Sequence, residues 1–206
     1  MININFLLVL FSILKLVNAS AQNTFTNQQY GFSITKPESW TFYRTSSFAV
    51  LDSIKDLKLN NTDLLNVITS NKNQIPLTIF CKYDAVHDRI NPLINVMIRP
   101  NKTTNTHDFF ELINKYPSSI KEVYKDAESV VQPKIILIDG IESVYLVTKY
   151  SLLFEGKAIH VRMRQYSIPK DNYYFQINCI DSSTDENEDC SLLFDQIQNT
   201  IRIARN

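Results

Sequence analysis

The chain has 206 residues, a length typical of one domain, and its 44% hydrophobic and 20% charged residues support a sizeable core and exclude intrinsic disorder. Its formal net charge of zero excludes a protein that attracts nucleic acid or an anionic membrane through an overall field, so any electrostatic function has to be local. Only three glycines are present, which argues against Gly-rich phosphate-binding loops.

The first 21 residues predict a secretory signal peptide. An apolar run over residues 6–17, broken by one serine and by Lys15, is shorter than the ~20 apolar residues that span a bilayer. Ala19 and Ala21 then occupy the two positions that a signal peptidase recognises, so we expect cleavage after Ala21 and a mature domain over 22–206. The alternative is an uncleaved anchor, which Lys15 disfavours. We therefore expect a secreted or periplasmic protein without a membrane span after cleavage.

The next elements are predicted to be a strand and a buried tryptophan. Residues 31–36 alternate apolar and polar side chains, with Phe32 and Ile34 on one face, as in a half-buried strand. Pro37 lacks the N–H group that a strand ladder needs and should end the strand. Trp40, the only tryptophan, is interpreted as a core anchor at the sheet edge.

The middle of the chain predicts two helices followed by two strands. Apolar residues at helical spacing indicate helices over 46–59 and 62–69, and apolar runs indicate strands over 76–84 and 93–100. One face of the first strand should carry Leu77, Ile79, Cys81 and Tyr83.

A further helix should begin at Thr106, whose hydroxyl can cap the open N–H groups. Its buried face follows the i, i+3, i+4, i+7 pattern, with Phe109, Leu112, Ile113 and Tyr116. Pro117 interrupts this run, and another turn should follow through Ile120, Val123 and Tyr124.

The C-terminal half predicts a four-stranded antiparallel meander. Asp139-Gly140 lies between two apolar runs, the strongest short hairpin signal, and Glu155-Gly156 repeats this arrangement. The expected strands are 130–138, 141–153, 157–167 and 173–180, and a helix over 189–203 should close the chain. Long antiparallel hairpins with flanking helices indicate an α+β fold.

Two stretches of the chain resemble PsbP-like and DcrB-like proteins. They are the opening, "YGFSI" at 30–34 with "PESW" at 37–40, and the end, "YYFQINCIDSST" at 173–184 with "CSLLFDQIQNTIRI" at 190–203. The resemblance implies an α/β/α sandwich built on a mainly antiparallel sheet, in one domain that spans the mature chain. It implies binding rather than catalysis, since the superfamily includes a photosystem II subunit, a Ran-binding protein and many exported bacterial proteins. No functional residue is carried over.

No catalytic or metal-binding constellation assembles in the sequence. It has no Gly-x-Ser-x-Gly elbow, no His-Glu-x-x-His pair and no two of its three histidines four residues apart. Asp84 and Asp88 beside His87 allow a weak cation site, although a solvated turn is the simpler interpretation. The acidic run 181–189 lacks the glycine and spacing of a calcium loop, and is interpreted as a solvated loop that favours the next helix N-terminus. We expect no enzyme, cofactor or metal, with an uncharacterised hydrolase as the alternative.

The cysteines predict one disulfide in an exported protein. Cys179 and Cys190 flank the acidic run, where a bridge would join a strand end to a helix start. Cys81 lies in an apolar strand pattern and is interpreted as a small buried hydrophobe.

Strand register predicts a basic, tyrosine-rich sheet face. A two-residue turn at Glu155-Gly156 places Lys149 opposite Arg162 and Tyr145 opposite Tyr166. A five-residue connection at 168–172 would put Tyr173, Phe175 and Ile177 on the apolar face of the sheet. A four-residue connection would mix apolar and basic groups on both faces, so we expect the five-residue one. The candidate site then comprises Tyr145, Lys149, His160, Arg162, Arg164, Tyr166 and Tyr174, with Gln176 and Asn178 beside them.

Like charges directly opposite each other destabilise a sheet, so this face is a candidate site for an anionic ligand or partner. The alternatives are a solvated face, or a face covered by a helix whose acids pair with the bases. The sequence as a whole predicts an exported, non-catalytic protein that binds a partner protein or an envelope component. A binder of small anionic ligands through the basic face is the alternative.

Overall fold

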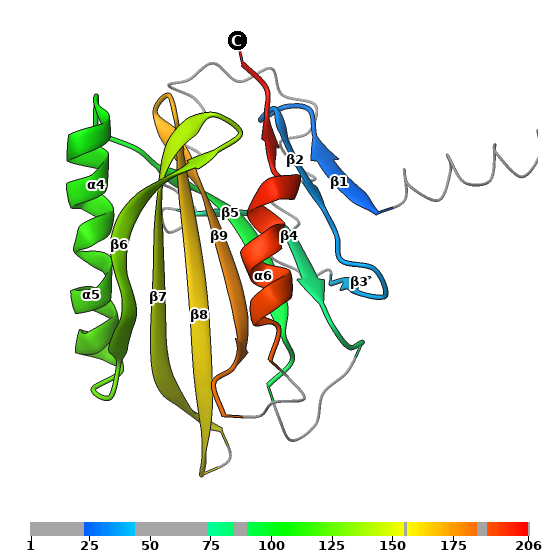
Figure 1. The fold of residues 1–206 in the computed structure, drawn as a ribbon, viewed down its shortest axis with the longest axis vertical. Helices are drawn as coiled ribbons and strands as arrows, with labels where there is room; N and C mark the ends of the chain where they lie inside the picture. Colours follow the sequence, from blue (N-terminus) through cyan, green and yellow to red (C-terminus); the bar gives the residue numbers. More distant parts are fainter. Residues whose placement is uncertain (1–22, 44–73, 85–89, 155, 185–188, 206) are drawn as a thin grey trace, which may run out of the picture.

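The computed structural model describes residues 23–43, 74–84, 90–154, 156–184 and 189–205. A long antiparallel sheet forms its middle layer, and a pair of helices packs on one face (Figure 1). The other face carries one short helix and a small second sheet. Helices thus flank a mainly antiparallel sheet, as the α+β prediction requires. The predicted leader and the helices expected over 46–59 and 62–69 lie outside the described residues.

The large sheet has seven strands in the order β3-β4-β5-β9-β8-β7-β6, and every neighbouring pair is antiparallel. The strands are β3 (Thr41–Phe42), β4 (Ile75–Cys81), β5 (Leu93–Pro100), β9 (Tyr173–Ser182), β8 (Lys157–Lys170), β7 (Ile141–Phe154) and β6 (Glu128–Ile138). The small sheet contains β1 (Thr24–Asn27), β2 (Phe32–Thr35) and β10 (Arg202–Ile203), in the order β1-β2-β10.

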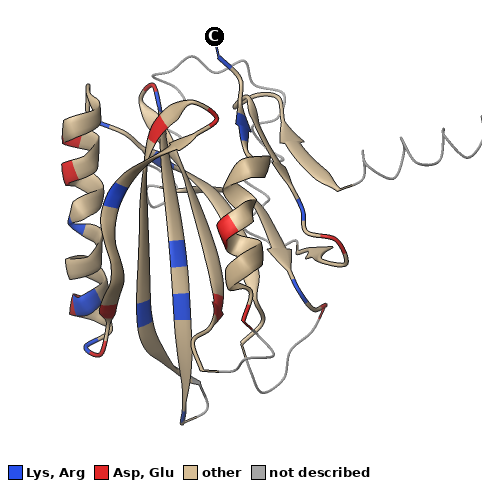
Figure 2. Cartoon of the chain, in the orientation of Figure 1, with Lys and Arg blue, Asp and Glu red and all other residues tan. Residues whose placement is uncertain are grey.

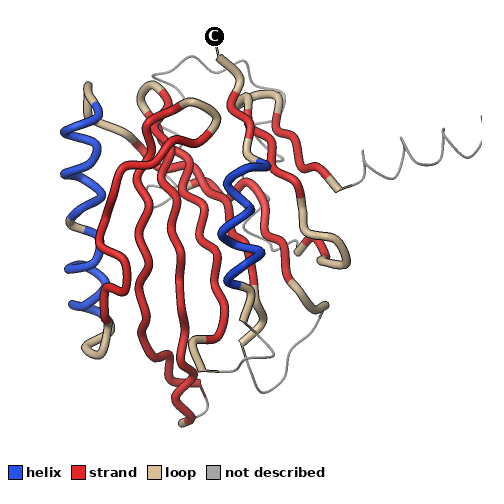
Figure 3. Tube along the Cα trace, viewed as in Figure 1, coloured by secondary structure: helices blue, strands red, loops and turns tan. Residues whose placement is uncertain are grey.

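The helices are α4 (Thr106–Asn114), α5 (Tyr116–Val123) and α6 (Ser191–Ile197), the last followed by a short 3-10 turn, Gln198–Thr200. Figure 3 shows α4 and α5 in line beside β6 and β7, while α6 lies in front of the central strands. The main core lies beneath α6 and the small sheet, and two smaller clusters lie beneath α4 and α5. The predicted cap of α4 is wrong, because Asn105 accepts the Asp108 N–H in place of Thr106.

The N-terminal predictions are confirmed at β2 and Trp40. Phe32 and Ile34 are buried while Ser33 and Thr35 are only partly buried, and Trp40 is 6% exposed against the ring of Phe194. Gly31 adopts φ +61° in the turn before β2, and a Cβ there would lie 2.7 Å from the Cβ of Ala204. This close approach lets β10 pair with β2.

The predicted C-terminal helix is too long. It ends at Ile197, and Ile201 and Ile203 are buried on either side of the exposed Arg202, an alternation typical of a strand. Asp139 accepts the N–H of Ile203, which fixes this strand against the β6–β7 turn.

The face predicted for β4 is also wrong. The register shifts between Pro76 and Thr78, so a bulge moves Phe80 into the core, where it is fully buried. Ile79, expected to share the face of Leu77, is only partly buried.

The hairpin predictions are confirmed at the first two turns and wrong at the third. Asp139 and Gly140 both have positive φ, as a type I′ turn requires. Phe154 pairs with Lys157 across the second turn. The third connection has two residues instead of five, because β8 continues to Lys170 and pairs it with Tyr173.

Candidate functional site

The shorter third turn reverses the face of every side chain in β9. Arg162 lies opposite Asp181, Arg164 opposite Cys179 and Tyr166 opposite Ile177. The basic side chains of β8 therefore share the face of α6 and the main core. Tyr174, Gln176 and Asn178 lie on the other face, and Tyr174 packs edge-on against Phe109 of α4. The prediction that Tyr174 joins the basic set is wrong.

The other six predicted residues do share one face, but they form a buried end and an exposed end. Tyr166 is 1% exposed and its hydroxyl donates to the Phe194 carbonyl at 2.8 Å, while the Tyr145 ring packs on it. Burial raises the pKa of Tyr166. His160 lies at the exposed end, and Lys149 between the two is partly buried.

A four-residue row explains how the sheet tolerates Lys149 opposite Arg162. In consecutive strands the row reads Glu128, Lys149, Arg162 and Asp181. Each base therefore has a carboxylate residue opposite it on its other side, and opposite charges across strands are stabilising. Figure 2 shows basic positions along β8, with acidic positions at the end of β9 and on α6.

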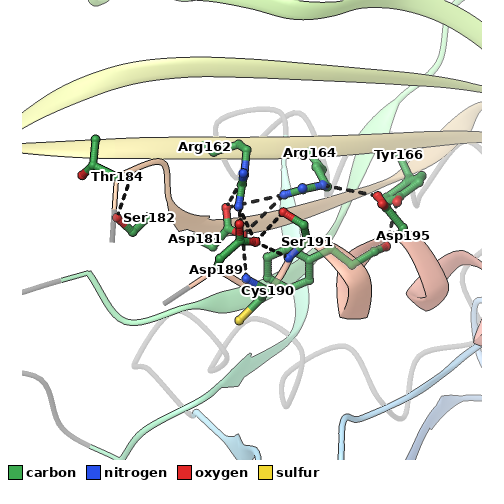
Figure 4. Close-up of polar contacts among 11 residues, drawn as sticks. Arg162, Arg164, Tyr166, Asp181, Ser182, Thr184, Asp189, Cys190, Ser191 and Asp195 are labelled. Atoms are coloured by element: carbon green, nitrogen blue, oxygen red, sulfur yellow. Dashed lines mark hydrogen bonds and ion pairs between the residues drawn. The ribbon is translucent and has the colours of Figure 1, made fainter. Parts of the chain in front are cut away.

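Asp181 is the centre of this charge cluster and is fully buried. Arg162 donates to its two oxygens from Nε at 3.0 Å and from Nη2 at 2.7 Å, a bidentate pair (Figure 4). Arg164 contacts both oxygens at 3.5 Å. The backbone N–H of Cys190 donates to the same carboxylate at 3.0 Å, which ties the start of α6 to the sheet.

Two further carboxylates complete the neutralisation. Asp189 contacts Arg162 at 2.7 Å, and Asp195 of α6 contacts Arg164 at 3.5 Å. Arg164 is 5% exposed and its guanidinium lies 5.7 Å from the centre of the Phe194 ring. Of the alternatives that the sequence left open, the structure has a face covered by a helix whose acids pair with the bases. The cluster docks α6 and is not an open anion site.

The interpretation of 181–189 as a solvated loop is wrong at the buried Asp181, whereas Asp189 at the other end is exposed. Asp181 is buried and Asp189 is bound to Arg162, although Asp189 also accepts the Ser191 N–H at the start of α6, as a negative charge there should. The signal that sequence reasoning missed was Asp171-Asn172, a pair that suits a two-residue turn, with Asp171 at φ +51°.

The predicted disulfide between Cys179 and Cys190 is not formed, and the three cysteines are buried thiols. Asp181 makes the connection expected of the bridge, since it joins the end of β9 to the N–H of Cys190. Burial raises the pKa of Cys179, which disfavours the thiolate that disulfide exchange requires. Cys81 is buried as predicted.

Ser151, His160 and Asp126 supply the side-chain types of a hydrolytic triad at the exposed end of the face. His160 Nδ1 lies 2.9 Å from Ser151 Oγ, and a hydrogen bond with Ser151 lowers the pKa of Asp126. The hydroxyl thus contacts both the carboxylate and the imidazole, whereas a triad needs the imidazole between the other two groups. In this arrangement Asp126 does not orient the His160 ring, as the carboxylate of a triad must, so His160 is not set up as a general base.

The described residues give little support to the other candidate sites. No group of three His, Cys, Asp or Glu side chains within them is arranged to hold a metal ion. His87 lies outside the described residues. None of the helices that the structure describes is long and apolar enough to cross a membrane.

Acidification should weaken the contact that Asp189 makes with Arg162. The hydroxyl of Ser191 and the charge of Arg162 lower the pKa of Asp189 from 3.8 to about 2. A carboxyl group with a lowered pKa in the folded state stabilises it above pH ~4, and this contribution is lost as the pH falls towards 2. Denaturant titrations should therefore show Asp189→Asn less stable than wild type at about pH 6, with the difference shrinking as pH falls through this window. A difference that grew on acidification would contradict the assignment.

Comparisons with known proteins identify the fold. No family model matches the sequence, and no curated protein matches it. The solution structure of cyanobacterial PsbP (CyanoP) from Synechocystis sp. PCC 6803 is similar, with a TM-score of 0.51 at 11% identity, over 88% of this chain and 91% of that one. The fold is therefore PsbP-like, as the sequence resemblance implied.

Two further structures are similar at lower scores. LpqN, involved in cell envelope biogenesis of Mycobacterium tuberculosis, has a TM-score of 0.45 at 14% identity, over 84% of this chain and 83% of that one. A protein of unknown function from Pseudomonas aeruginosa, PA94, described as a putative regulator, has a TM-score of 0.46 at 13% identity, over 81% of this chain and 98% of that one.

Proposed function

We propose that this PsbP-like protein is exported, is not an enzyme, and binds a partner protein by adding a strand of that partner to the outer edge of β6. The apolar run, Ala19 and Ala21 at the N-terminus support export. The buried, internally neutralised arginine cluster gives the alternative of an anionic ligand at that face no support. The observation that carries the proposal is the apolar edge of β6.

β6 is the last strand of the large sheet, and no described strand pairs with its outer side. Its pairing with β7 is irregular between Ser129 and Lys134, where Pro133 also lies, and regular from Lys134 to Ile138. Bulges and prolines protect an edge strand from pairing, so the regular stretch is the part left available. Its outward-facing backbone N–H and C=O groups have no strand partner among the described residues, so they are open to a strand that approaches.

Apolar side chains make this edge suitable for a polypeptide. Ile135 is 49% exposed and Leu137 is 69% exposed, on the face that also carries α4. In strand addition, backbone hydrogen bonds supply affinity and alternate side chains supply specificity. We therefore expect an extended apolar segment of the partner, and Lys134, the only charge between 134 and 138, favours an acidic residue at one end of it.

Site-specific photo-crosslinking in native extract tests this proposal. A photoreactive residue at Leu137 should yield a defined adduct, whereas one at Leu192, which is 81% exposed on the opposite face, should not. Leu137→Lys should weaken binding of the identified partner by about tenfold or more, since it removes an exposed apolar contact. Equal adducts from both positions, binding unchanged by Leu137→Lys, or an adduct only with a second copy of this chain would each overturn the proposal.

A further inference from the structure

The tight turn between β6 and β7 fixes which backbone groups of β6 point away from the sheet. The turn has only two residues, 139–140, so the pair that flanks it, Ile138 and Ile141, is a hydrogen-bonded pair. In an antiparallel ladder such pairs alternate with pairs whose N–H and C=O groups point outward. Counting back along β6, the residues with outward-pointing backbone groups are Leu137 and Ile135.

The same two residues carry the exposed apolar side chains of this edge. Ile135 and Leu137 are both exposed, and both lie on the face of α4. No described strand pairs with the outer side of β6. A polypeptide added here therefore receives backbone hydrogen bonds and apolar contacts from the same positions, two residues apart.

Lys134 gives the edge a positive charge at one end. It lies opposite Tyr145, and its Nζ is 5.5 Å from the centre of that ring, on the face of α6. Pro133 precedes it, in the stretch where pairing with β7 is irregular, so the regular edge ends at Lys134. The edge is therefore asymmetric, with apolar side chains towards the turn and a base at the far end.

The rest of the sheet favours one direction for an added strand. Every neighbouring pair in the large sheet is antiparallel, and antiparallel pairing is slightly more stable per residue than parallel pairing. An antiparallel strand reaches the position opposite Leu137 first along its own sequence. The positions opposite Ile135 and Lys134 follow later, so the direction fixes the order of the side chains that the edge selects.

We infer that the partner segment runs antiparallel to β6 and reads apolar, any residue, apolar, acidic from its N-terminal end, an inference that rests on the function proposed above. Its apolar residues lie opposite Leu137 and Ile135. Its acidic residue lies opposite Lys134, where opposite charges across strands are stabilising. The residue between the apolar ones lies opposite Ile136, which already packs against the main core.

A second copy of this chain does not fit this pattern. Two β6 strands paired through their outward-pointing residues would place Ile135 of one copy opposite Leu137 of the other. Lys134 would then lie opposite Ile138, with no acid across from it. Charge complementarity therefore favours a different polypeptide.

Selection from a random nine-residue peptide library on the mature chain tests the inference, with Leu137→Lys as the counter-selection. Peptides that bind wild type but not this variant should carry the apolar, any, apolar, acidic order. Lys134→Glu should shift the preference at the last position from acidic to basic by up to about fivefold. Selected peptides with the acid before the apolar pair, or no peptide that depends on Leu137, would overturn the inference.

The proposed function is tested separately, because it fails when native extract yields no adduct at Leu137, whichever peptides are selected. A native adduct at Leu137 on a segment without this order would overturn the inference and leave the proposed function standing.

N-methylation of a selected peptide distinguishes the two strand directions. In antiparallel pairing the N–H groups of its two apolar residues face β6, and the N–H of the residue between them faces away. N-methylation at either apolar residue should weaken binding about tenfold, and N-methylation between them should not, as measured by fluorescence anisotropy. In parallel pairing the middle N–H faces β6, so the reverse pattern would show that the assigned direction is wrong.

Discussion

Asp181→Ala should destabilise the fold by about 3–5 kcal/mol, because removing one partner from a buried charge cluster leaves the other charges uncompensated. Asp181 is fully buried and accepts hydrogen bonds from Arg162, Arg164 and the Cys190 N–H. Its loss would leave Arg164 with one contact to an exposed acid and would free the start of α6. Denaturant unfolding at neutral pH measures the difference in the free energy of unfolding.

Asp195→Ala provides the matched control. The same kind of group is removed, but this side chain is 59% exposed and contacts Arg164 at 3.5 Å, so the cost should stay below about 1 kcal/mol. Replacing the charges together, with Arg162→Met, Arg164→Met and Asp181→Leu, should recover much of the stability that Asp181→Ala loses. Equal effects of Asp181→Ala and Asp195→Ala would show that the cluster does not hold the fold together as described.

The parts of the fold that sequence reasoning predicted depend on local chemistry. Asp139-Gly140 places positive φ where a tight hairpin needs it, and the turn after Phe154 sets β7 against β8 in the predicted register. The alternation of apolar and polar residues around Phe32 likewise indicates directly which face of β2 is buried. Each of these signals is contained within a few residues, so no information from distant segments is needed.

The candidate site was predicted incorrectly because its register depended on an assumption about burial. Separating apolar from basic side chains favoured a five-residue connection, yet Arg164 shares its face with Cys179 and the main core. An arginine is buried at acceptable cost when carboxylates and an aromatic ring surround it, and here Asp181 and Phe194 do so. Those partners come from segments distant along the chain, which periodicity cannot bring together.

The missed strand β10 and the β4 bulge have the same kind of cause. Ile201 fits both the helical spacing of Leu193 and Ile197 and a strand alternation with Ile203, and pairing with β2, about 170 residues earlier, decides between them. The extra residue in β4 becomes visible only in its register with β5. Elements whose conformation depends on a distant partner are those that a single sequence leaves undetermined.

Phe194→Ala should destabilise the protein by about 3–5 kcal/mol, because it opens a cavity where α6 meets the sheet. Phe194 is fully buried, its ring lies edge-on to Trp40 at 6.0 Å, and the guanidinium of Arg164 lies over it. Leu192→Ala on the same helix is the control and should change stability by no more than about 0.5 kcal/mol, since Leu192 is 81% exposed. Because the Phe194 ring also shields the arginine cluster, Phe194→Ala and Asp181→Ala should be non-additive when combined. Additive losses in denaturant titrations would mean that the apolar and charged contacts of α6 act independently.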